Sequence, residues 1–184
     1  LCYPNETLQY PGINAIVAGD GEVAMARILE CVESGVYKNG IPGVHFKVFG
    51  IHGNIFYHET DIDSLPSPDR SLLPIELYSS VLGRDRLITT MITSRGCPFS
   101  CVLCKIHLQK PVSHSIEKVL SDFDHIHRLG IKEVEIYDDT FTWSHDRVVG
   151  ICKGLIERNY KIKWAIRDRV SNVTEETLKW LKKA

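Results

Sequence analysis

Apolar and polar residues follow two different patterns along the chain, and the change falls near residue 75. Beyond that position, short apolar stretches are followed by segments with apolar residues at helical spacing. The stretches cover residues 87–92, 134–137 and 162–166, and the helical segments cover residues 116–126, 148–156 and 174–181. Three strand–helix units in succession predict a parallel sheet with right-handed crossovers. We therefore expect an α/β fold for residues 75–184.

The first forty residues predict one strand followed by one helix. Residues 13–18 are apolar, and the turn Gly19-Asp20-Gly21-Glu22 leads into a segment with apolar residues at positions 23, 26, 28, 29 and 32. This spacing is typical of an amphipathic helix with those positions on its apolar face. Glycine and proline at residues 40–43 then interrupt the pattern.

Residues 41–74 predict a hairpin and then a linker. Residues 44–49 and 54–58 read as two short strands, and the glycines at positions 50 and 53 supply the turn between them. Residues 61–74 contain three prolines among Asp, Ser and Leu, a composition typical of an extended linker. The pattern thus separates residues 1–40, 41–74 and 75–184.

The composition is that of an ordinary globular protein, with 43% hydrophobic residues, 24% charged residues and a net charge of −1. A balanced charge gives no reason to expect binding to nucleic acid or to an anionic membrane. No apolar run approaches the roughly 18 residues of a membrane span, and no signal peptide is visible. We expect a cytoplasmic protein. Because the chain begins at Leu1 and stops in a helical pattern, we also expect a fragment of a longer one.

Three of the six cysteines lie within eight residues, at Cys97, Cys101 and Cys104. This C-x3-C-x2-C run follows the first strand of the parallel unit, at the end of the sheet where α/β folds assemble active sites. Clustered thiols in such a chain favour a metal site in a reducing compartment over disulfides. Thiolates select iron–sulfur clusters, zinc or copper(I). A cubane held by three cysteines leaves one iron open to another ligand.

Structural zinc is the alternative for the same three thiols. His107 follows Cys104 by three residues and would be the fourth ligand. Structural zinc sites usually take their cysteines as two separated pairs, which one short trio does not supply. The spacing therefore favours the iron–sulfur cluster.

The cysteine spacing, together with the surrounding Ser94-Arg95-Gly96-Cys97-Pro98, resembles the radical S-adenosylmethionine (SAM) superfamily, in particular the subgroup with an N-terminal cobalamin-binding domain. The turn of residues 19–22 is similar to the Gly-Glu-Gly-Glu turn of that domain, and residues 138–141 match the subgroup's Asp-Asp-x-Phe pattern. The resemblance implies the first half of a radical SAM (βα)6 partial barrel. The tail end of a cobalamin-binding-like α/β domain and a β-hairpin linker would precede it.

Two departures from the subgroup's pattern limit the resemblance. The position before the third cysteine is usually aromatic and lies near the SAM adenine, whereas here it is Leu103. The Asp-x-His-x-x-Gly motif that places a histidine under cobalt does not occur in this sequence. Cobalamin is therefore implied for a parent protein only.

The resemblance also implies a set of cofactor-binding residues. Asp138 and Asp139, one or both, would hold the SAM amino group, although Asp at the end of a strand also favours a plain turn. Arg167 would bind the SAM carboxylate, with a solvated charge as the alternative. Phe99 would shield the cluster from water, unless it only packs.

The activity implied by the resemblance is reductive cleavage of SAM to methionine and a 5′-deoxyadenosyl radical, which abstracts hydrogen from a substrate. Methyl transfer is the expected reaction if the parent binds cobalamin. The expected partners are a small-molecule or peptide substrate and a reductant such as flavodoxin or ferredoxin. The alternative from another class is a non-catalytic zinc or iron–sulfur structural module.

Overall fold

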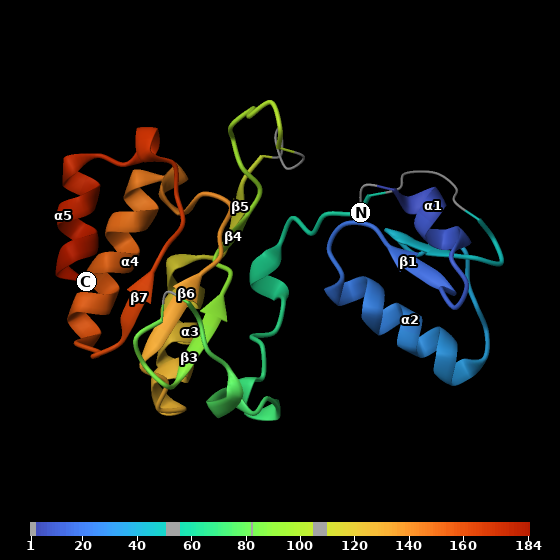
Figure 1. Ribbon diagram of the computed structural model, residues 1–184, viewed down its shortest axis with the longest axis horizontal. Coiled ribbons are helices and arrows are strands. Elements are labelled where there is room, and N and C mark those ends of the chain that lie inside the picture. The colour runs from blue at the N-terminus through green and yellow to red at the C-terminus, as the bar shows by residue number, and fades with distance from the viewer. Residues whose placement is uncertain (1–2, 51–55, 82, 105–109) are drawn as a thin grey trace. The chain divides into compact units, whose positions relative to one another are not determined.

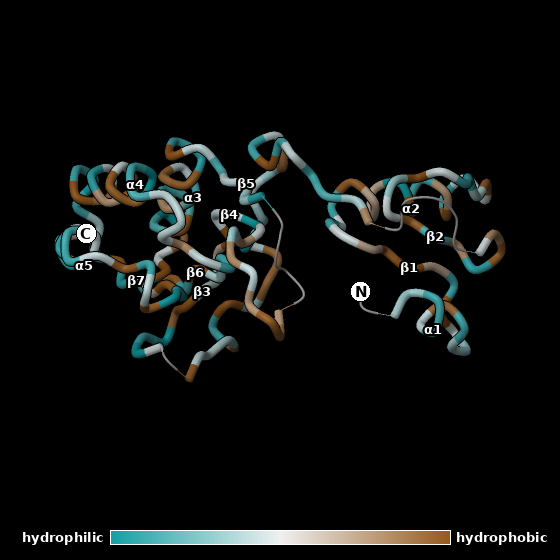
Figure 2. Tube along the Cα trace, turned by 90° about the horizontal axis from the view of Figure 1, so that it is seen from above, coloured by the Kyte–Doolittle hydropathy of each residue, from teal (hydrophilic) through white to brown (hydrophobic). Residues whose placement is uncertain are grey.

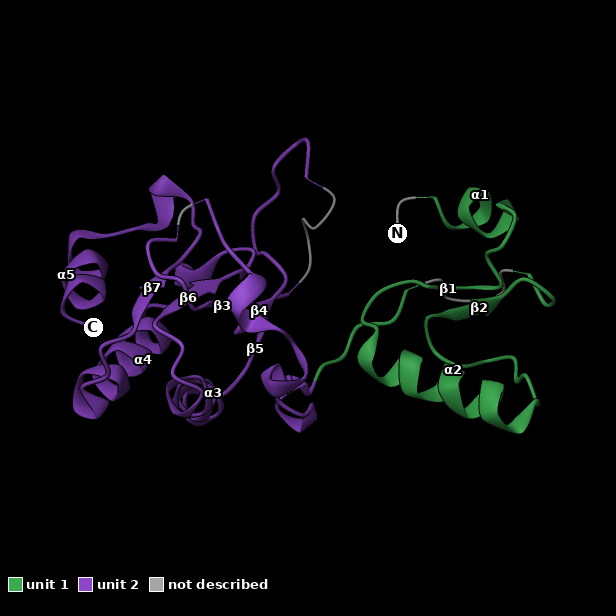
Figure 3. Ribbon diagram, turned by 60° about the horizontal axis from the view of Figure 1, so that its bottom comes forward, with its two compact units in different colours: residues 1–60 green, residues 61–184 purple. Residues whose placement is uncertain are grey.

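The computed structural model describes residues 3–50, 56–81, 83–104 and 110–184, and the chain divides into two compact units (Figure 3). Unit 1 comprises residues 1–60 and unit 2 comprises residues 61–184. Each unit has a hydrophobic core of its own. Within the described ranges, no helix is long and apolar enough to cross a membrane.

Unit 1 is built around a two-stranded antiparallel sheet. Its elements are α1 (Pro4–Gln9), β1 (Ala15–Val17), α2 (Glu22–Ser34) and β2 (Val44–Phe46). β1 and β2 pair with Ala15 opposite Phe46. Ala24 and Cys31 of α2 form the core of the unit with Val44 and Phe46 of β2.

The buried face of α2 differs in part from the predicted one, of which Ile28 does pack against the core. Val23, Leu29 and Val32, which the spacing assigns to the apolar face, are 41%, 53% and 57% exposed. The buried positions are Ala24 and Cys31, seven residues apart on one stripe of the helix. Val23, Leu29 and Val32 stay exposed because the two short strands of unit 1 cover only a narrow stripe of α2.

The first strand of the predicted hairpin (residues 44–49 and 54–58) is present as β2, but no pairing of β2 with residues 56–58 occurs among the described residues. β2 pairs with β1, and Tyr57 forms an isolated parallel bridge with Gly19; residues 51–55 lie outside the described residues. Gly19 has a φ of 101°, and a Cβ atom there would lie 1.8 Å from the carbonyl oxygen of Tyr57. Only glycine allows this close approach of two backbones. Sequence spacing missed the pairing because it cannot choose among neighbouring strands.

Unit 2 contains a three-stranded parallel sheet in the order β3–β6–β7 (Figure 1). Its strands are β3 (Ile88–Met91), β4 (Ser94–Arg95), β5 (Val112–Ser113), β6 (Glu133–Ile136) and β7 (Lys163–Ala165). Its α-helices are α3 (Ile116–Arg128), α4 (His145–Arg158) and α5 (Glu175–Lys183). Short 3-10 turns are η1 (Ile62–Ser64), η2 (Arg70–Leu72), η3 (Ile75–Leu77), η4 (Phe141–Trp143) and η5 (Val170–Asn172). The predicted strand–helix order and parallel pairing are confirmed.

α3 and α4 pack on one face of this sheet. Val134 and Ile136 of β6 lie in the core with Phe123 of α3 and Val148 of α4. Apolar and polar residues alternate around the turns of both helices, which is why each buries a single side (Figure 2). Side chains alternate along a strand, so Glu135 of β6 points to the opposite face of the sheet. This face, the polar face of the sheet, borders a cavity whose other wall is formed by residues 73–81.

The segment of residues 61–74, predicted as an extended linker, is held against the rest of unit 2. Asp63 accepts a hydrogen bond from the backbone N–H of Ser115 at 3.0 Å. Arg70 is 4% exposed and donates to the backbone carbonyl of Thr90 at 2.9 Å. These contacts give the segment a fixed place, unlike a free linker. The assignment of residues 1–40 to a cobalamin-binding-like domain stays a prediction.

Candidate functional site

The three clustered cysteines lie on a loop at the carboxyl end of the parallel sheet. The chain leaves β3, forms β4, and returns through β5, which pairs antiparallel with β4 so that Ser94 lies opposite Ser113. This two-stranded ribbon brings together the two ends of the intervening loop (Figure 1). Part of the loop, including the predicted zinc ligand His107, lies outside the described residues.

The loop cysteines are accessible thiols. Cys97 and Cys104 are half-buried and Cys101 is exposed, and the described cysteines form no disulfide. In contrast, burial raises the pKa of the Cys152 thiol to about 11, so that this cysteine stays protonated. Thiolates are the form that binds metal. The exposed loop is therefore the place where the chain can offer thiolate ligands.

A single metal ion has no ready-made ligand set in the described part of the chain, where no group of three His, Cys, Asp or Glu side chains is arranged around one point. Zinc requires sulfur ligands about 2.3 Å away from one centre. A cubane cluster offers each thiolate its own iron, so its ligands need not converge on one atom. Three thiol donors on one loop are the ligand set of a cluster that binds three cysteines and leaves one iron open.

Asp138 holds the start of the cysteine loop. Its side chain is fully buried and accepts four hydrogen bonds, from the backbone N–H and the hydroxyl of both Thr93 and Ser94. The hydroxyl bonds measure 2.6 Å from Thr93 and 2.7 Å from Ser94. The hydrogen bonds from Thr93 and Ser94 therefore occupy the acceptor sites of this carboxylate.

Arg147, near the start of α4, supplies the counter-charge for Asp138. Its Nη2 lies 3.7 Å from Asp138 Oδ2 and donates to the carbonyl oxygen of Thr93 at 2.9 Å. Burial lowers the pKa of the Arg147 guanidinium, and the charge of Asp138 opposes that shift. Its Nε and Nη1 atoms are buried and find no hydrogen-bond partner among the described residues. Arg147 was not singled out from the sequence. The only feature that could have indicated it is a positive charge next to the apolar residues of a predicted helix.

Asp139 takes a different position from its neighbour. It is exposed, and its Oδ2 accepts a hydrogen bond from the backbone N–H of Gly96 at 2.9 Å, one residue before Cys97. Gly96 has a φ of 85°, a conformation that favours glycine. Of the two predicted carboxylates, only Asp139 lies beside the cysteine loop with access to solvent.

Two further side chains contact cysteine sulfurs, and sequence reasoning assigned neither a role at the cluster. Thr140 Oγ1 lies 3.3 Å from Cys97 Sγ, and Arg169 Nη1 lies 3.7 Å from Cys101 Sγ. The guanidinium of Arg169 also lies 4.2 Å from the ring centroid of Phe99. Hydrogen bonds and charges at the sulfurs are among the factors that set the potential of an iron–sulfur cluster.

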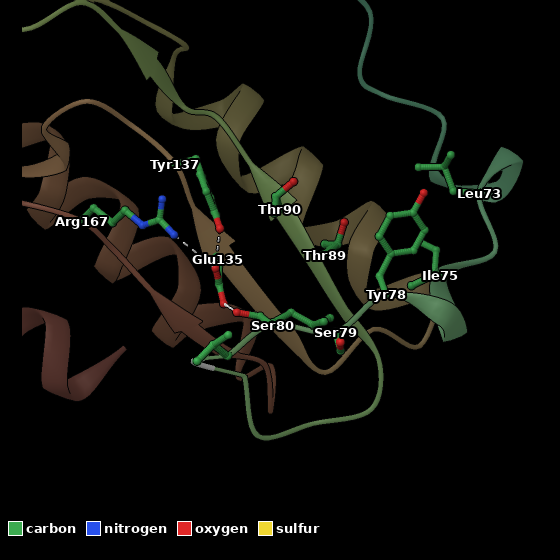
Figure 4. Close-up of a pocket in the computed structure, with 12 residues that line it drawn as sticks. Leu73, Ile75, Tyr78, Ser79, Ser80, Thr89, Thr90, Glu135, Tyr137 and Arg167 are labelled. Atoms are coloured by element: carbon green, nitrogen blue, oxygen red, sulfur yellow. Dashed lines mark hydrogen bonds and ion pairs between the residues drawn. The ribbon is translucent and has the colours of Figure 1, made fainter.

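The remaining two predicted residues lie apart from these contacts. Leu103 is 97% exposed. Arg167 follows β7 and stacks on the ring of Tyr137 at 3.6 Å, with its Nη2 3.7 Å from Glu135 Oε2. Glu135, Tyr137 and Arg167 line a cavity of about 410 Å³ on the polar face of the sheet (Figure 4). Glu135 and Tyr137 were not predicted, because alternate residues of a short buried strand carry no distinctive signal.

No protein-family model matches the chain. The chain is 32% identical over 179 residues to an uncharacterized methyltransferase from Pyrococcus horikoshii, an alignment that covers 94% of this chain and 38% of that protein. It is 26% identical over 188 residues to an anaerobic magnesium-protoporphyrin IX monomethyl ester cyclase from Rubrivivax gelatinosus, covering 95% of this chain and 33% of that protein. The chain thus spans about a third of the length of these curated relatives.

Among solved structures, the chain resembles the radical S-adenosylmethionine methyltransferase TsrM from Kitasatospora setae in two forms. The TM-scores are 0.70 and 0.68 at 16% identity, over 98% of this chain and 37% and 38% of those chains. One form holds tryptophan and a SAM analogue, and the other holds cobalamin and a 4Fe–4S cluster. The likeness confirms the mixed α/β fold. The chain is thus similar in fold to a protein of the predicted kind, a radical SAM methyltransferase that binds cobalamin and a 4Fe–4S cluster.

Proposed function

We propose that this chain supplies the cluster-binding part of a radical SAM enzyme. Cys97, Cys101 and Cys104 would each bind one iron of a 4Fe–4S cluster, and the fourth iron would bind SAM. The observation that carries the proposal is the cysteine loop itself, closed by a ribbon at the carboxyl edge of a parallel sheet. Thiolate ligands suit the cluster, and that edge is where barrel-like folds assemble active sites. β3, β6 and β7 would then be the first strands of a partial barrel.

When bound, the reduced cluster and SAM supply a 5′-deoxyadenosyl radical, and the chain's own residues prepare the place for this chemistry. Asp138 and Arg147 fix the stem of the loop through Thr93 and Ser94. Asp139 offers its exposed carboxylate to the ammonium group of SAM, a charge-assisted bond. This contact would add to the hydrogen bond that Asp139 already accepts from the loop.

Three other residues of the loop region act on the cluster or on SAM in this proposal. Phe99, covered by the Arg169 guanidinium, limits the access of water to the cluster. The hydroxyl of Thr140 donates to the carbonyl oxygen of Asp139 at 2.8 Å and lies 3.3 Å from Cys97 Sγ, so it would turn its proton to the thiolate when the cluster is bound. Leu103, exposed in the chain alone, would be covered by the adenine of SAM.

For the longer protein we propose cobalamin-dependent methyl transfer. The support is that two relatives are methyltransferases by name and that one of them binds cobalamin. The substrate would be a small molecule or a peptide. A flavodoxin or ferredoxin of the cytoplasm would supply the electron, because loop thiolates and a reduced cluster require a reducing compartment.

The proposal is tested by anaerobic reconstitution with iron and sulfide, followed by electron paramagnetic resonance of the reduced protein with and without SAM. We expect a reduced 4Fe–4S signal that shifts when SAM is added, because SAM binds the open iron. One tightly held zinc with no iron uptake would contradict the proposal and indicate the structural module.

Two cysteine variants provide the matched comparison. Cys101→Ala should abolish both the cluster and SAM cleavage, because it removes one iron ligand. Cys31→Ala, at a buried cysteine in the core of unit 1, should keep both. Full iron content and SAM cleavage in Cys101→Ala would mean that the loop is not the cluster site.

A further inference from the structure

The cavity on the polar face of the parallel sheet has an apolar wall and a charged end. One wall comes from residues 73–81, including Leu73 and Tyr78, and the opposite wall comes from β3, β6 and the residue Arg167 after β7 (Figure 4). Its volume of about 410 Å³ lies within the range of small-molecule sites. Most of its lining is apolar, whereas Glu135, Tyr137 and Arg167 lie together at one end (Figure 4).

Arg167 is the accessible charge of this cavity. Its side chain is 51% exposed, and one face of the guanidinium lies 3.6 Å from the centre of the Tyr137 ring. Stacking on an aromatic ring restrains the guanidinium without using its N–H donors. An arginine held in this way presents a planar fork of donors, which matches a carboxylate in two-point contact.

Glu135 limits which anions Arg167 can accept. Its side chain is 5% exposed, accepts hydrogen bonds from the hydroxyls of Tyr137, at 2.9 Å, and Ser80, and lies 3.7 Å from Arg167. These hydroxyls occupy Glu135, so a ligand meets Arg167 first. The buried negative charge offsets one unit of positive charge, which disfavours a doubly charged phosphate more than a singly charged carboxylate.

We propose that this cavity binds an organic monocarboxylate with an apolar body, anchored by Arg167. The apolar body would contact Leu73, Tyr78 and Ile88, which line the same cavity. The inference rests on the proposed radical SAM function, because it names a ligand for the same unit. The ligand would be a carboxylate substrate, and binding of the methionyl carboxylate of SAM to Arg167 is the competing outcome.

The test uses the reconstituted, oxidised protein and two probes, 3-phenylpropionate and its uncharged amide, in ligand-observed saturation-transfer NMR titrations. We expect the acid to bind about tenfold more tightly than the amide, since hydrogen bonds between charged groups are stronger than neutral ones. Arg167→Gln should remove this preference and Arg167→Lys should restore part of it. Arg158→Gln, at a surface ion pair with Asp124, should keep it. Equal binding of acid and amide to the unmodified protein would overturn the proposal, as would an unchanged preference in Arg167→Gln.

Adding SAM to these samples, with the cluster signal recorded on parallel reduced samples, separates a substrate carboxylate from that of SAM. If SAM displaces 3-phenylpropionate and Arg167→Gln loses the SAM-induced shift of the cluster signal, Arg167 binds SAM and the proposal of a substrate site is overturned. If the probe still binds beside SAM and the shift is unchanged, the carboxylate belongs to a substrate. Failure of the radical SAM function would instead appear as no cluster signal in the unmodified protein, whatever the probes do.

Discussion

Two neighbouring carboxylates of identical type have different surroundings in this protein. Asp138 is buried, saturated by four donors and paired with Arg147, whereas Asp139 is exposed with one hydrogen bond to Gly96. A buried charge without its partner is costly, while an exposed one is solvated by water. The first residue therefore acts on the stability of the loop stem and the second is available to a ligand.

This difference predicts opposite phenotypes for Asp138→Asn and Asp139→Asn. We expect Asp138→Asn to lower the free energy of unfolding by about 3 kcal/mol, because it leaves Arg147 as an uncompensated buried charge. Asp139→Asn should cost less than about 1 kcal/mol but weaken the SAM-induced shift of the cluster signal. Urea unfolding followed by tryptophan fluorescence measures the first quantity.

The double variant Asp138→Asn with Arg147→Met is the control for the charge pair. Removal of both charges should recover part of the stability that the single variant loses, since no unpaired charge stays buried. Strictly additive losses in the three variants would show that the two residues do not act as a pair.

Arg169 permits a prediction about the cluster itself. A cation near a sulfur ligand stabilises the more negative, reduced state of the cluster, so Arg169→Gln should shift the reduction potential to a more negative value. Arg169→Lys should lie between the two, because it keeps the charge and loses the planar stack on Phe99. A redox titration monitored by electron paramagnetic resonance gives the potentials. Identical values for all three proteins would remove Arg169 from the cluster environment.

At the scale of elements, the segment of residues 61–74 is fastened to α3 through Asp63. This residue accepts a hydrogen bond from the backbone N–H of Ser115, which is the N-cap of α3, and contacts His114 Nδ1 at 3.0 Å. Burial raises the pKa of Asp63, but the hydrogen bonds from Ser115 and His114 outweigh it and hold the pKa below its ordinary value. The attachment therefore depends on an ionised carboxylate.

The lowered pKa of Asp63 predicts a pH dependence at the acid end. A carboxyl group of this kind stabilises the fold fully above its unfolded pKa of about 3.9, and the contribution is lost as the pH falls through the lower, folded value. Asp63→Asn should be less stable than the unmodified chain at pH of about 6, and the difference should shrink toward pH of about 3. Thermal unfolding across this range measures it, and parallel curves would contradict the prediction.

At the scale of the whole molecule, each unit has a separate core, and all three tryptophans belong to unit 2. Gly19→Ala should destabilise unit 1, because the added Cβ would lie 1.8 Å from a backbone oxygen of Tyr57. The cluster signal and the tryptophan-detected unfolding transition should be unchanged. A change in either would show that the folding of the two units is coupled, and Gly21→Ala, with open space around its Cβ, is the matched control.

The order of elements in unit 2 followed from the sequence alone, because strand and helix periods are local properties that each segment carries within itself. The cysteine loop was also readable, since its three thiols are adjacent in the chain. The different surroundings of Asp138 and Asp139 could not be predicted from the sequence. Neighbouring residues in an extended chain point to opposite sides, and which side is buried depends on the elements that pack against it. The pairing of β2 with β1, the link from Arg147 to Thr93 and the cavity around Arg167 all join residues far apart in sequence. Such contacts exist only once the chain has folded, so only the tertiary structure decided them.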